Sequence, residues 1–136
     1  MKNIKFLGLV LLISININAA DLNNEDKFKL AKSYDISGKS YEAGELYVEL
    51  MTEGYTKSFA PLGLLYVDGK IGSKNNCSKG LSLIFSGLAE KECNAYYAMS
   101  SLYKTGRCVN ESKIDYIKSG KFSLKYLECV KKDRKY

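Results

Sequence analysis

The absence of histidine restricts the chemistry that the cysteines of this chain can perform. The 136 residues include four cysteines and no histidine. Without histidine, serine and cysteine nucleophiles lack their usual general base, and the commonest metal ligand is missing. The cysteines are Cys77, Cys93, Cys108 and Cys129, with 15, 14 and 20 residues between them. No two form a close zinc-ribbon pair, so we predict structural disulfides, no metal site and no cofactor.

One short segment fits two catalytic motifs at once. Ser101 and Lys104 have the Ser-x-x-Lys spacing, and Lys104 also begins a Lys-Thr-Gly sequence, the box found in β-lactamases. In those enzymes the two motifs are separate elements, whereas here both need the same lysine. The third motif, Ser-Asp-Asn, is absent from the sequence. We interpret the segment as a helix that ends at Gly106, predict no catalytic residue, and rank penicillin-binding or β-lactamase-like activity last.

Charged residues of opposite sign recur at helical spacing in two places. The acidic stripe is Glu42, Glu45, Glu49 and Glu53. The basic stripe is Lys118, Lys121, Lys125 and Lys132, beside an apolar line of Ile117, Leu124 and Leu127. Steps of three and four residues place each stripe along one face of a helix. Either stripe is a solvated face or a docking strip for an oppositely charged protein, and an anionic membrane is a further alternative for the lysines.

Tyrosine is unusually frequent, with 11 residues in the chain. Tyr47, Tyr66 and Tyr103 fall at packing positions of the expected helices. Exposed tyrosines supply contact area at interfaces with little loss of entropy. The predicted partner-binding residues therefore combine four tyrosines with the charged stripes: Tyr41, Glu42, Glu45, Glu49, Tyr55, Tyr96, Tyr97, Lys118, Lys121 and Lys125.

These residues must be positioned by helices, because apolar residues recur every three to four positions through most of the chain. The periodicity predicts helices over residues 25–37, 41–53, 58–67, 77–89, 93–105 and 112–130. Residues 58–69 also recur 37 residues later as 95–106, with Tyr66 aligned to Tyr103 and Gly69 to Gly106. A fixed period of this length indicates a stacked helical repeat, in which glycine ends a helix.

The repeat has a recognisable pattern of small and aromatic residues. The first unit carries it at Leu62, Gly63, Tyr66, Gly69, Gly80 and Gly87. The second unit carries it at Ala95, Met99, Ser100, Tyr103 and Gly106. Both units resemble the Sel-one-like repeat, a relative of the tetratricopeptide repeat, and the segment from Ala31 to Ala43 resembles a tetratricopeptide hairpin.

The resemblance implies an all-α fold in which about three antiparallel helix hairpins stack as a short right-handed α-solenoid. It also implies a non-enzymatic module that binds another protein in the groove formed by its first helices. Small secreted members of this family guard the periplasm against antibacterial effectors of type VI secretion, notably lipases. An immunity or inhibitor role is the favoured expectation, because the repeats fill most of the chain. The alternative is an adaptor or regulator of an envelope complex.

Antiparallel helices also predict which cysteines pair. A helix of about 13 residues is roughly 20 Å long, whereas a disulfide needs Cα atoms within about 7 Å. Cysteines at opposite ends of one helix, such as Cys77 and Cys93, are therefore disfavoured as partners. Neighbouring antiparallel helices instead bring Cys77 to Cys108 and Cys93 to Cys129. We predict these two disulfides, which suit an oxidising compartment.

The first residues have the order of a secretory signal. Lys2 and Lys5 precede an apolar run over 6–15 that is too short to span a membrane, and Ala19 and Ala20 offer a cleavage site. We expect a leader over 1–20, a repeat domain over 21–130 and a basic tail over 131–136. The protein is expected to be periplasmic or secreted, without a stable membrane anchor or nucleic acid, and a monomer or weak oligomer.

Formal charge is divided unevenly along the expected mature chain. Residues 21–60 contain eight acidic and five basic side chains, a charge of −3, whereas residues 61–136 contain seven and fourteen, a charge of +7. Such an asymmetry bears on the partners of a protein rather than on its fold.

Overall fold

The computed structural model describes residues 18–72, 74, 76–109 and 113–135, and all regular structure within these residues is helical. The predicted leader falls largely on residues 1–17, which lie outside the described ranges. The six α-helices are α1 (Asn24–Ile36), α2 (Ser40–Thr52), α3 (Phe59–Val67), α4 (Cys77–Ala89), α5 (Cys93–Thr105) and α6 (Tyr116–Asp133). Two short 3-10 helices occupy Ala19–Asp21 and Thr56–Ser58. The all-helical prediction is confirmed, and α4 and α5 have the predicted limits.

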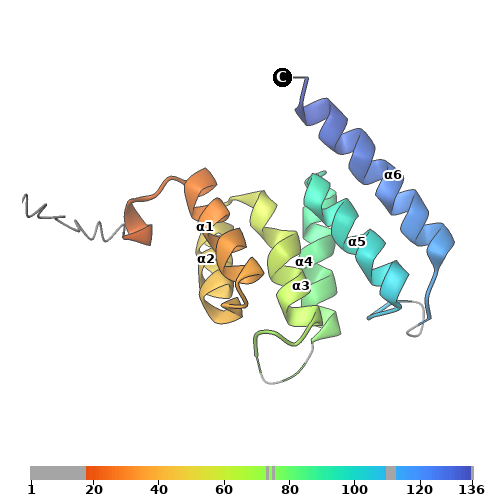
Figure 1. Cartoon of the computed structure of the whole chain (residues 1–136), viewed down its shortest axis with the longest axis horizontal. Coiled ribbons are helices and arrows are strands. Elements are labelled where there is room, and N and C mark those ends of the chain that lie inside the picture. The colour runs from red at the N-terminus through yellow and green to blue at the C-terminus, as the bar shows by residue number, and fades with distance from the viewer. Residues whose placement is uncertain (1–17, 73, 75, 110–112, 136) are drawn as a thin grey trace, which may run out of the picture.

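Each odd-numbered helix packs most extensively against the next helix in the chain: α1 on α2, α3 on α4, and α5 on α6. In Figure 1, α1, α3 and α5 lie on the near side, with α2 and α4 behind them. The aligned glycines Gly69 and Gly106 follow α3 and α5 with φ angles of 65° and 71°. Glycine adopts this left-handed conformation without strain, which explains why both repeat helices end at the same aligned position.

Small residues allow the paired helices to approach closely. A Cβ atom at Gly63 of α3 would lie 2.6 Å from the carbonyl oxygen of Gly80 in α4, so neither position has room for a side chain. The aligned residue on α5 is Ser100, whose hydroxyl donates to the carbonyl oxygen of Ser119 on α6 at 3.0 Å. Ser100 Oγ also lies 2.7 Å from Ser123 Oγ. The α5–α6 pair is therefore held by a hydrogen-bonded serine cluster, whereas in the α3–α4 pair glycine packs against glycine.

The core consists of two clusters that share α3. Leu62 and Leu65 of α3 are buried with side chains of α1 and α2, including Tyr47, which is 1% exposed. On its other side, α3 contributes Ala60 and Val67 to a cluster with α4 and α5. Burial of Tyr47 agrees with its predicted packing role. Because α3 belongs to both clusters, it connects the α1–α2 pair to the rest of the molecule.

Two disulfides join the helices as the antiparallel arrangement predicts. Cys77 at the start of α4 pairs with Cys108 after α5, with Cα atoms 5.3 Å apart. Cys93 at the start of α5 pairs with Cys129 on α6, with Cα atoms 5.5 Å apart. The first bond joins the start of α4 to the segment after α5, and the second fixes α6 covalently to α5.

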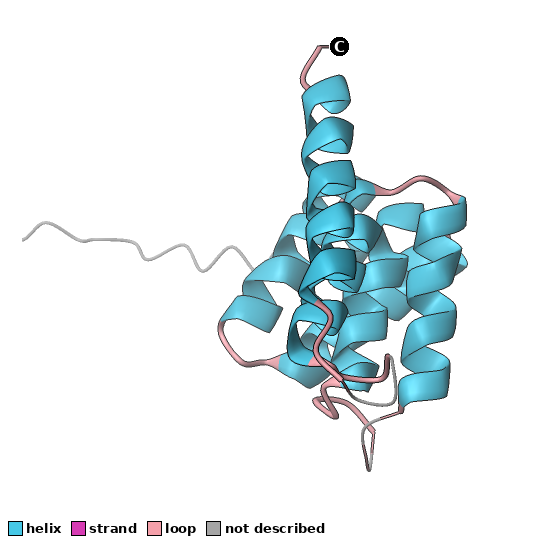
Figure 2. Ribbon diagram, turned by 90° about the vertical axis from the view of Figure 1, so that its right-hand side faces the viewer, coloured by secondary structure: helices cyan, strands magenta, loops and turns pink. Residues whose placement is uncertain are grey.

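The last helix differs from its predicted limits at both ends. It begins at Tyr116 because the side chain of Asp115 caps it, accepting a hydrogen bond from the backbone N–H of Lys118 at 2.9 Å. It continues to Asp133, so the first three residues of the predicted tail over 131–136 are helical. Figure 2 shows the end of α6 projecting beyond the other helices. Within the described ranges, no helix is long and apolar enough to cross a membrane.

Candidate protein-binding surfaces

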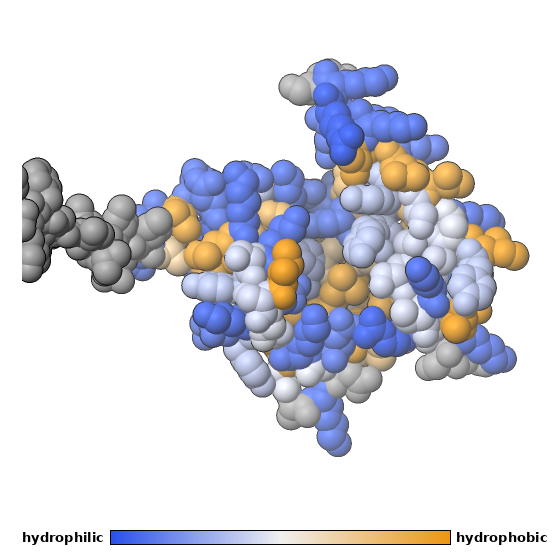
Figure 3. Space-filling model, viewed as in Figure 1, coloured by the Kyte–Doolittle hydropathy of each residue, from blue (hydrophilic) through white to orange (hydrophobic). Residues whose placement is uncertain are grey.

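A groove runs across the face that carries α1, α3 and α5. It encloses about 330 Å³ and also receives Tyr47 of α2 and Tyr126 of α6. The residues that line it are Phe28, Lys32, Asp35, Ile36, Tyr47, Pro61, Leu64, Asn94, Tyr97 and Tyr126. Figure 3 shows this face, with apolar atoms exposed in the hollow between the two ends of the molecule. We call this cavity the front groove.

Aromatic and aliphatic side chains dominate the front groove. Ile36 at the end of α1 is 85% exposed, although its side chain is large and apolar. Tyr97 of α5 is also exposed, and its ring centroid lies 5.6 Å from that of Tyr126 on α6. Lys32 and Asp35 place one charge of each sign at the α1 wall. Exposed aromatic anchors with few charges are typical of the central part of protein interfaces.

Asn94 supplies a polar atom to the wall of the front groove. Its Nδ2 donates to the carbonyl oxygen of Lys57 at 2.6 Å. Its Oδ1 is buried and accepts a hydrogen bond from no described residue. Buried polar atoms in folded proteins are nearly always paired. Among the ten predicted partner-binding residues, only Tyr97 lies in this groove. Asn94 and Ile36 gave no sequence signal, because neither belongs to a charged stripe or an aromatic set.

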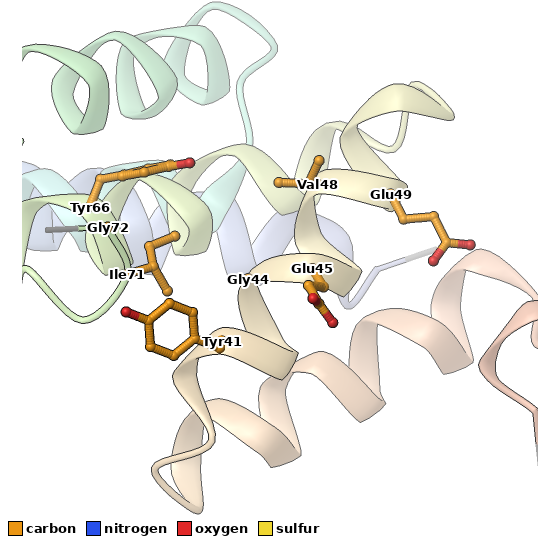
Figure 4. A pocket seen from close by; sticks show the side chains of 8 residues that line it. All are labelled: Tyr41, Gly44, Glu45, Val48, Glu49, Tyr66, Ile71 and Gly72. Carbon is orange, nitrogen blue, oxygen red and sulfur yellow. The ribbon is translucent and has the colours of Figure 1, made fainter.

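A second cavity of about 450 Å³ lies on the opposite side of α2 and brings together three predicted site residues. Tyr41, Glu45 and Glu49 of α2 line it with Tyr66 of α3 and Ile71 of the following loop. Figure 4 shows Tyr41 beside Ile71, whereas the carboxylate of Glu49 points away from both. The cavity is therefore apolar at one end and acidic only at its rim. We call it the α2 cavity.

The acidic stripe is partly neutralised by a lysine that the sequence reading missed. Lys27 of α1 is 3% exposed, and its Nζ donates to Glu49 at 2.6 Å and to Glu53 at 3.0 Å. These hydrogen bonds raise the pKa of Lys27. Glu42 and Glu45 remain exposed and form no ion pair with any described residue. Half of the predicted acidic docking strip therefore holds α1 to α2.

The side chain of Tyr55, a predicted partner-binding residue, makes contacts within the molecule. Its ring centroid lies 5.6 Å from that of Phe28, and its hydroxyl donates to the carboxylate of Glu25. That hydrogen bond lowers the pKa of Glu25, and burial raises the pKa of Tyr55. Tyr55 thus joins the start of α1 to the turn after α2.

The predicted basic residues lie along α6, apart from the acidic ones. Lys118, Lys121 and Lys125 are all exposed, and the amino groups of Lys118 and Lys125 lie 5.3 and 5.7 Å from the ring centroids of Tyr103 and Phe122. Tyr96 lines a cavity of about 390 Å³ with Lys125. Tyr96 and Tyr97 are neighbours in sequence, yet they face different surfaces of α5. The ten predicted residues therefore do not come together in one site.

The residues with catalytic or metal-binding spacing lie at the end of α5 and beside the second disulfide. Lys104 and Thr105 end α5 immediately before Gly106, which is the helix end predicted for this segment, and the described residues contain no strand to carry a Lys-Thr-Gly box. Cys93, Cys129 and Asp133 lie close enough together to hold a metal ion. Both sulfurs, however, are joined in a disulfide. A disulfide sulfur is not the thiolate that metals bind.

Searches of protein-family models, curated proteins and solved structures find no match to this chain. Its function is therefore inferred from the chemistry of its surfaces.

Proposed function

We propose that this protein is a non-enzymatic protein-binding module that acts outside the cytoplasm. Its helix pairs would form a short right-handed α-solenoid, with α1, α3 and α5 as the first helices of three hairpins. The observation that carries the proposal is the front groove, whose lining includes the exposed side chains of Ile36 and Tyr97, 85% and 57% exposed. Large exposed apolar groups gathered in one hollow mark an interaction site.

The dimensions and chemistry of the front groove suit a short segment of another protein. A cavity of about 330 Å³ accommodates one or two side chains of a partner. The paired rings of Tyr97 and Tyr126 offer a rigid surface for an apolar side chain. An apolar anchor side chain is the recognition element that we infer.

Within this class we favour an immunity protein or inhibitor that blocks an antibacterial effector of the lipase type delivered by type VI secretion. The resemblance of residues 58–69 and 95–106 to Sel-one-like repeats supports this choice, and the two disulfides suit an oxidising compartment such as the periplasm. The alternative is an adaptor that regulates an envelope complex through the same groove.

The two roles differ in what binding does to the partner. The oxidised protein, without residues 1–20, would be immobilised and used to capture proteins from envelope extracts and from effector-secreting neighbours. The captured partner would then be assayed for hydrolytic activity, with and without an equimolar amount of the module. A blocker abolishes that activity, whereas an adaptor leaves it unchanged. Capture of no protein by the wild type from either source would contradict both roles.

A further inference from the structure

The outward face of α6 is apolar over the first three turns of the helix, although no described element covers it. Tyr116, Ile117, Leu124 and Leu127 are 70%, 74%, 63% and 53% exposed. Gly120 lies among them, with open space where its Cβ atom would stand. We call these five residues the outer stripe. Single exposed leucines are ordinary on protein surfaces, but a continuous stripe over three turns marks an interaction surface.

The orientation of α6 is fixed by its other side. Ser119 is buried against Ser100 of α5, and the two side chains are hydrogen-bonded. Phe122 stacks on Tyr103 of α5, with ring centroids 5.7 Å apart. The disulfide of Cys129 holds the same side of the helix. The helix therefore cannot rotate to bury the outer stripe without losing these contacts.

Lysines border the outer stripe. Lys121, Lys125 and Lys132 follow one edge together with a single acid, Glu128, and Lys131 falls among the apolar residues at the helical spacing. All four lysine side chains are exposed. The formal charge of residues 61–136 is +7, against −3 for residues 21–60. In Figure 1, α1 and α2 lie at one end of the long axis and α6 lies at the other. The charge asymmetry therefore favours an orientation in which the outer stripe faces an anionic surface.

We propose that α6 docks the protein peripherally on an anionic lipid bilayer. The outer stripe would enter the boundary between headgroups and acyl chains, while the bordering lysines contact lipid phosphates. A helix with one apolar face and a lysine-rich flank has this mode of binding. The exposed area of four large apolar side chains would be buried when the helix binds. The lysines would be attracted to the anionic headgroups.

The shape of this end of the molecule favours a bilayer over a protein partner. Figure 2 shows α6 standing in front of the other helices. The outer stripe is exposed, whereas Ser119 on the other side of α6 is buried against α5, so the stripe belongs to the ridge that this helix forms. A fluid, planar bilayer adapts to such a ridge without a complementary groove. Symmetric pairing of two copies through α6 would instead bring two lysine-bordered edges together, each with Lys121, Lys125 and Lys132 against a single acid, Glu128. The net repulsion between these edges disfavours a second copy as the occupant.

A tryptophan reporter gives a direct test, because the chain contains no tryptophan. Leu127→Trp places the reporter in the outer stripe, and Phe85→Trp places it on α4, where Phe85 is 52% exposed. The oxidised protein without residues 1–20 would be mixed with vesicles of phosphatidylglycerol and phosphatidylethanolamine, or of phosphatidylcholine alone. We expect a blue shift for Leu127→Trp with the anionic vesicles only, and none for Phe85→Trp.

Matched variants separate the apolar and electrostatic contributions in vesicle co-sedimentation. Leu124→Ser with Leu127→Ser should weaken binding at least about tenfold, because two side chains leave the bilayer boundary. Each lysine near an anionic surface is worth about fivefold in partitioning, so Lys121→Glu with Lys125→Glu should also weaken binding by more than about tenfold. The control Lys29→Glu with Lys39→Glu changes net charge equally at α1 and α2 and should bind far more tightly than the α6 variant.

Three results would overturn the proposal. The first is wild-type protein that stays in the supernatant with anionic vesicles. The second is equal weakening by the α6 and α1–α2 charge reversals, which would indicate nonspecific attraction. The third is self-association in analytical ultracentrifugation without lipid that the Leu124→Ser and Leu127→Ser changes abolish, which would make a second copy the occupant. Ile36→Glu in the front groove should leave vesicle binding intact, so this test is independent of the proposed function.

Discussion

Replacing Gly63 by alanine is the most informative perturbation of the fold, because it probes the closest approach between two helices. A Cβ atom at Gly63 would lie 2.6 Å from the carbonyl oxygen of Gly80 and 2.8 Å from Cγ1 of Ile84. The oxygen belongs to the backbone of α4 and cannot move aside as the tip of a flexible side chain does. To admit the methyl group, α3 and α4 must separate or shift.

The expected magnitude is the difference between two effects. Alanine in a helix interior is favoured over glycine by about 1 kcal/mol. Overpacking a close contact costs about 1–3 kcal/mol, and a clash with backbone belongs at the upper end of this range. Gly63→Ala should therefore lower the free energy of unfolding by about 2 kcal/mol. For a domain of this size that corresponds to a fall in Tm of about 8 °C.

Gly120→Ala provides the matched control. Gly120 is also inside a helix, but nothing lies within 4 Å of the position that its Cβ atom would take. The same substitution there should stabilise the protein by about 0.5–1 kcal/mol through helix propensity alone. Both variants would be unfolded thermally and in urea with their disulfides intact, and followed by far-ultraviolet circular dichroism. If Gly63→Ala stabilises the protein as much as Gly120→Ala, the close pairing of α3 and α4 is wrong.

Further predictions concern the disulfide, the serine cluster and one carboxylate. Replacing Cys93 and Cys129 by serine should cost about 4 kcal/mol in urea unfolding, because the bond spans 36 residues. Ser100→Ala should cost about 1 kcal/mol in the same assay, since it removes a buried donor between α5 and α6. The hydrogen bond from Tyr55 lowers the pKa of Glu25 below 4.5 in the folded protein. The stabilisation from this hydrogen bond is therefore present above pH 4.5 and lost as the pH falls through the pKa of Glu25 in the folded protein. In the Tyr55→Phe variant, Tm should therefore decrease less on acidification than in the wild type. Equal acid declines in the two proteins would refute this assignment.

The sequence was informative where local chemistry decides the structure. Gly69 and Gly106 end their helices because both have positive φ, and the limits of α4 and α5 followed from the apolar periodicity. The disulfide partners followed from helix length and direction alone. These features depend on single helices and on the direction of their neighbours, so a pattern of small, apolar and terminating residues is sufficient to predict them.

Features that depend on which surfaces meet were not predictable in the same way. Lys27 is four residues before Ala31, so it lies on the same buried face of α1. This spacing was the one sign in the sequence that Lys27 would pair with an acidic side chain on another helix. The apolar line that includes Leu124 was expected beside the lysines, but periodicity does not reveal that α6 turns its serine side to α5. A hydrophobic pattern identifies an apolar face without identifying what covers it.

The candidate site shows the same division. Tyr97 was predicted from its type and position, and it lies in the front groove. The sequence did not indicate Ile36 and Asn94, because they meet in the groove only when α1 and α5 lie on either side of α3, and the groove is made by residues from five helices. Tyr55 was assigned to the surface, but its contacts with Phe28 and Glu25 place it in the packing of α1.

The most direct test of the central claim is the affinity of the captured partner for variants of the front groove and of the opposite face. Ile36→Glu with Tyr97→Ser changes two exposed groove residues, and Phe85→Ser changes an exposed residue of similar size on α4. Isothermal titration with the oxidised proteins should show at least about tenfold weaker binding for the groove variant, since hot-spot residues dominate interface energies. The Phe85→Ser variant should bind as the wild type does. Equal affinity of the groove variant and the wild type would contradict partner binding in the front groove.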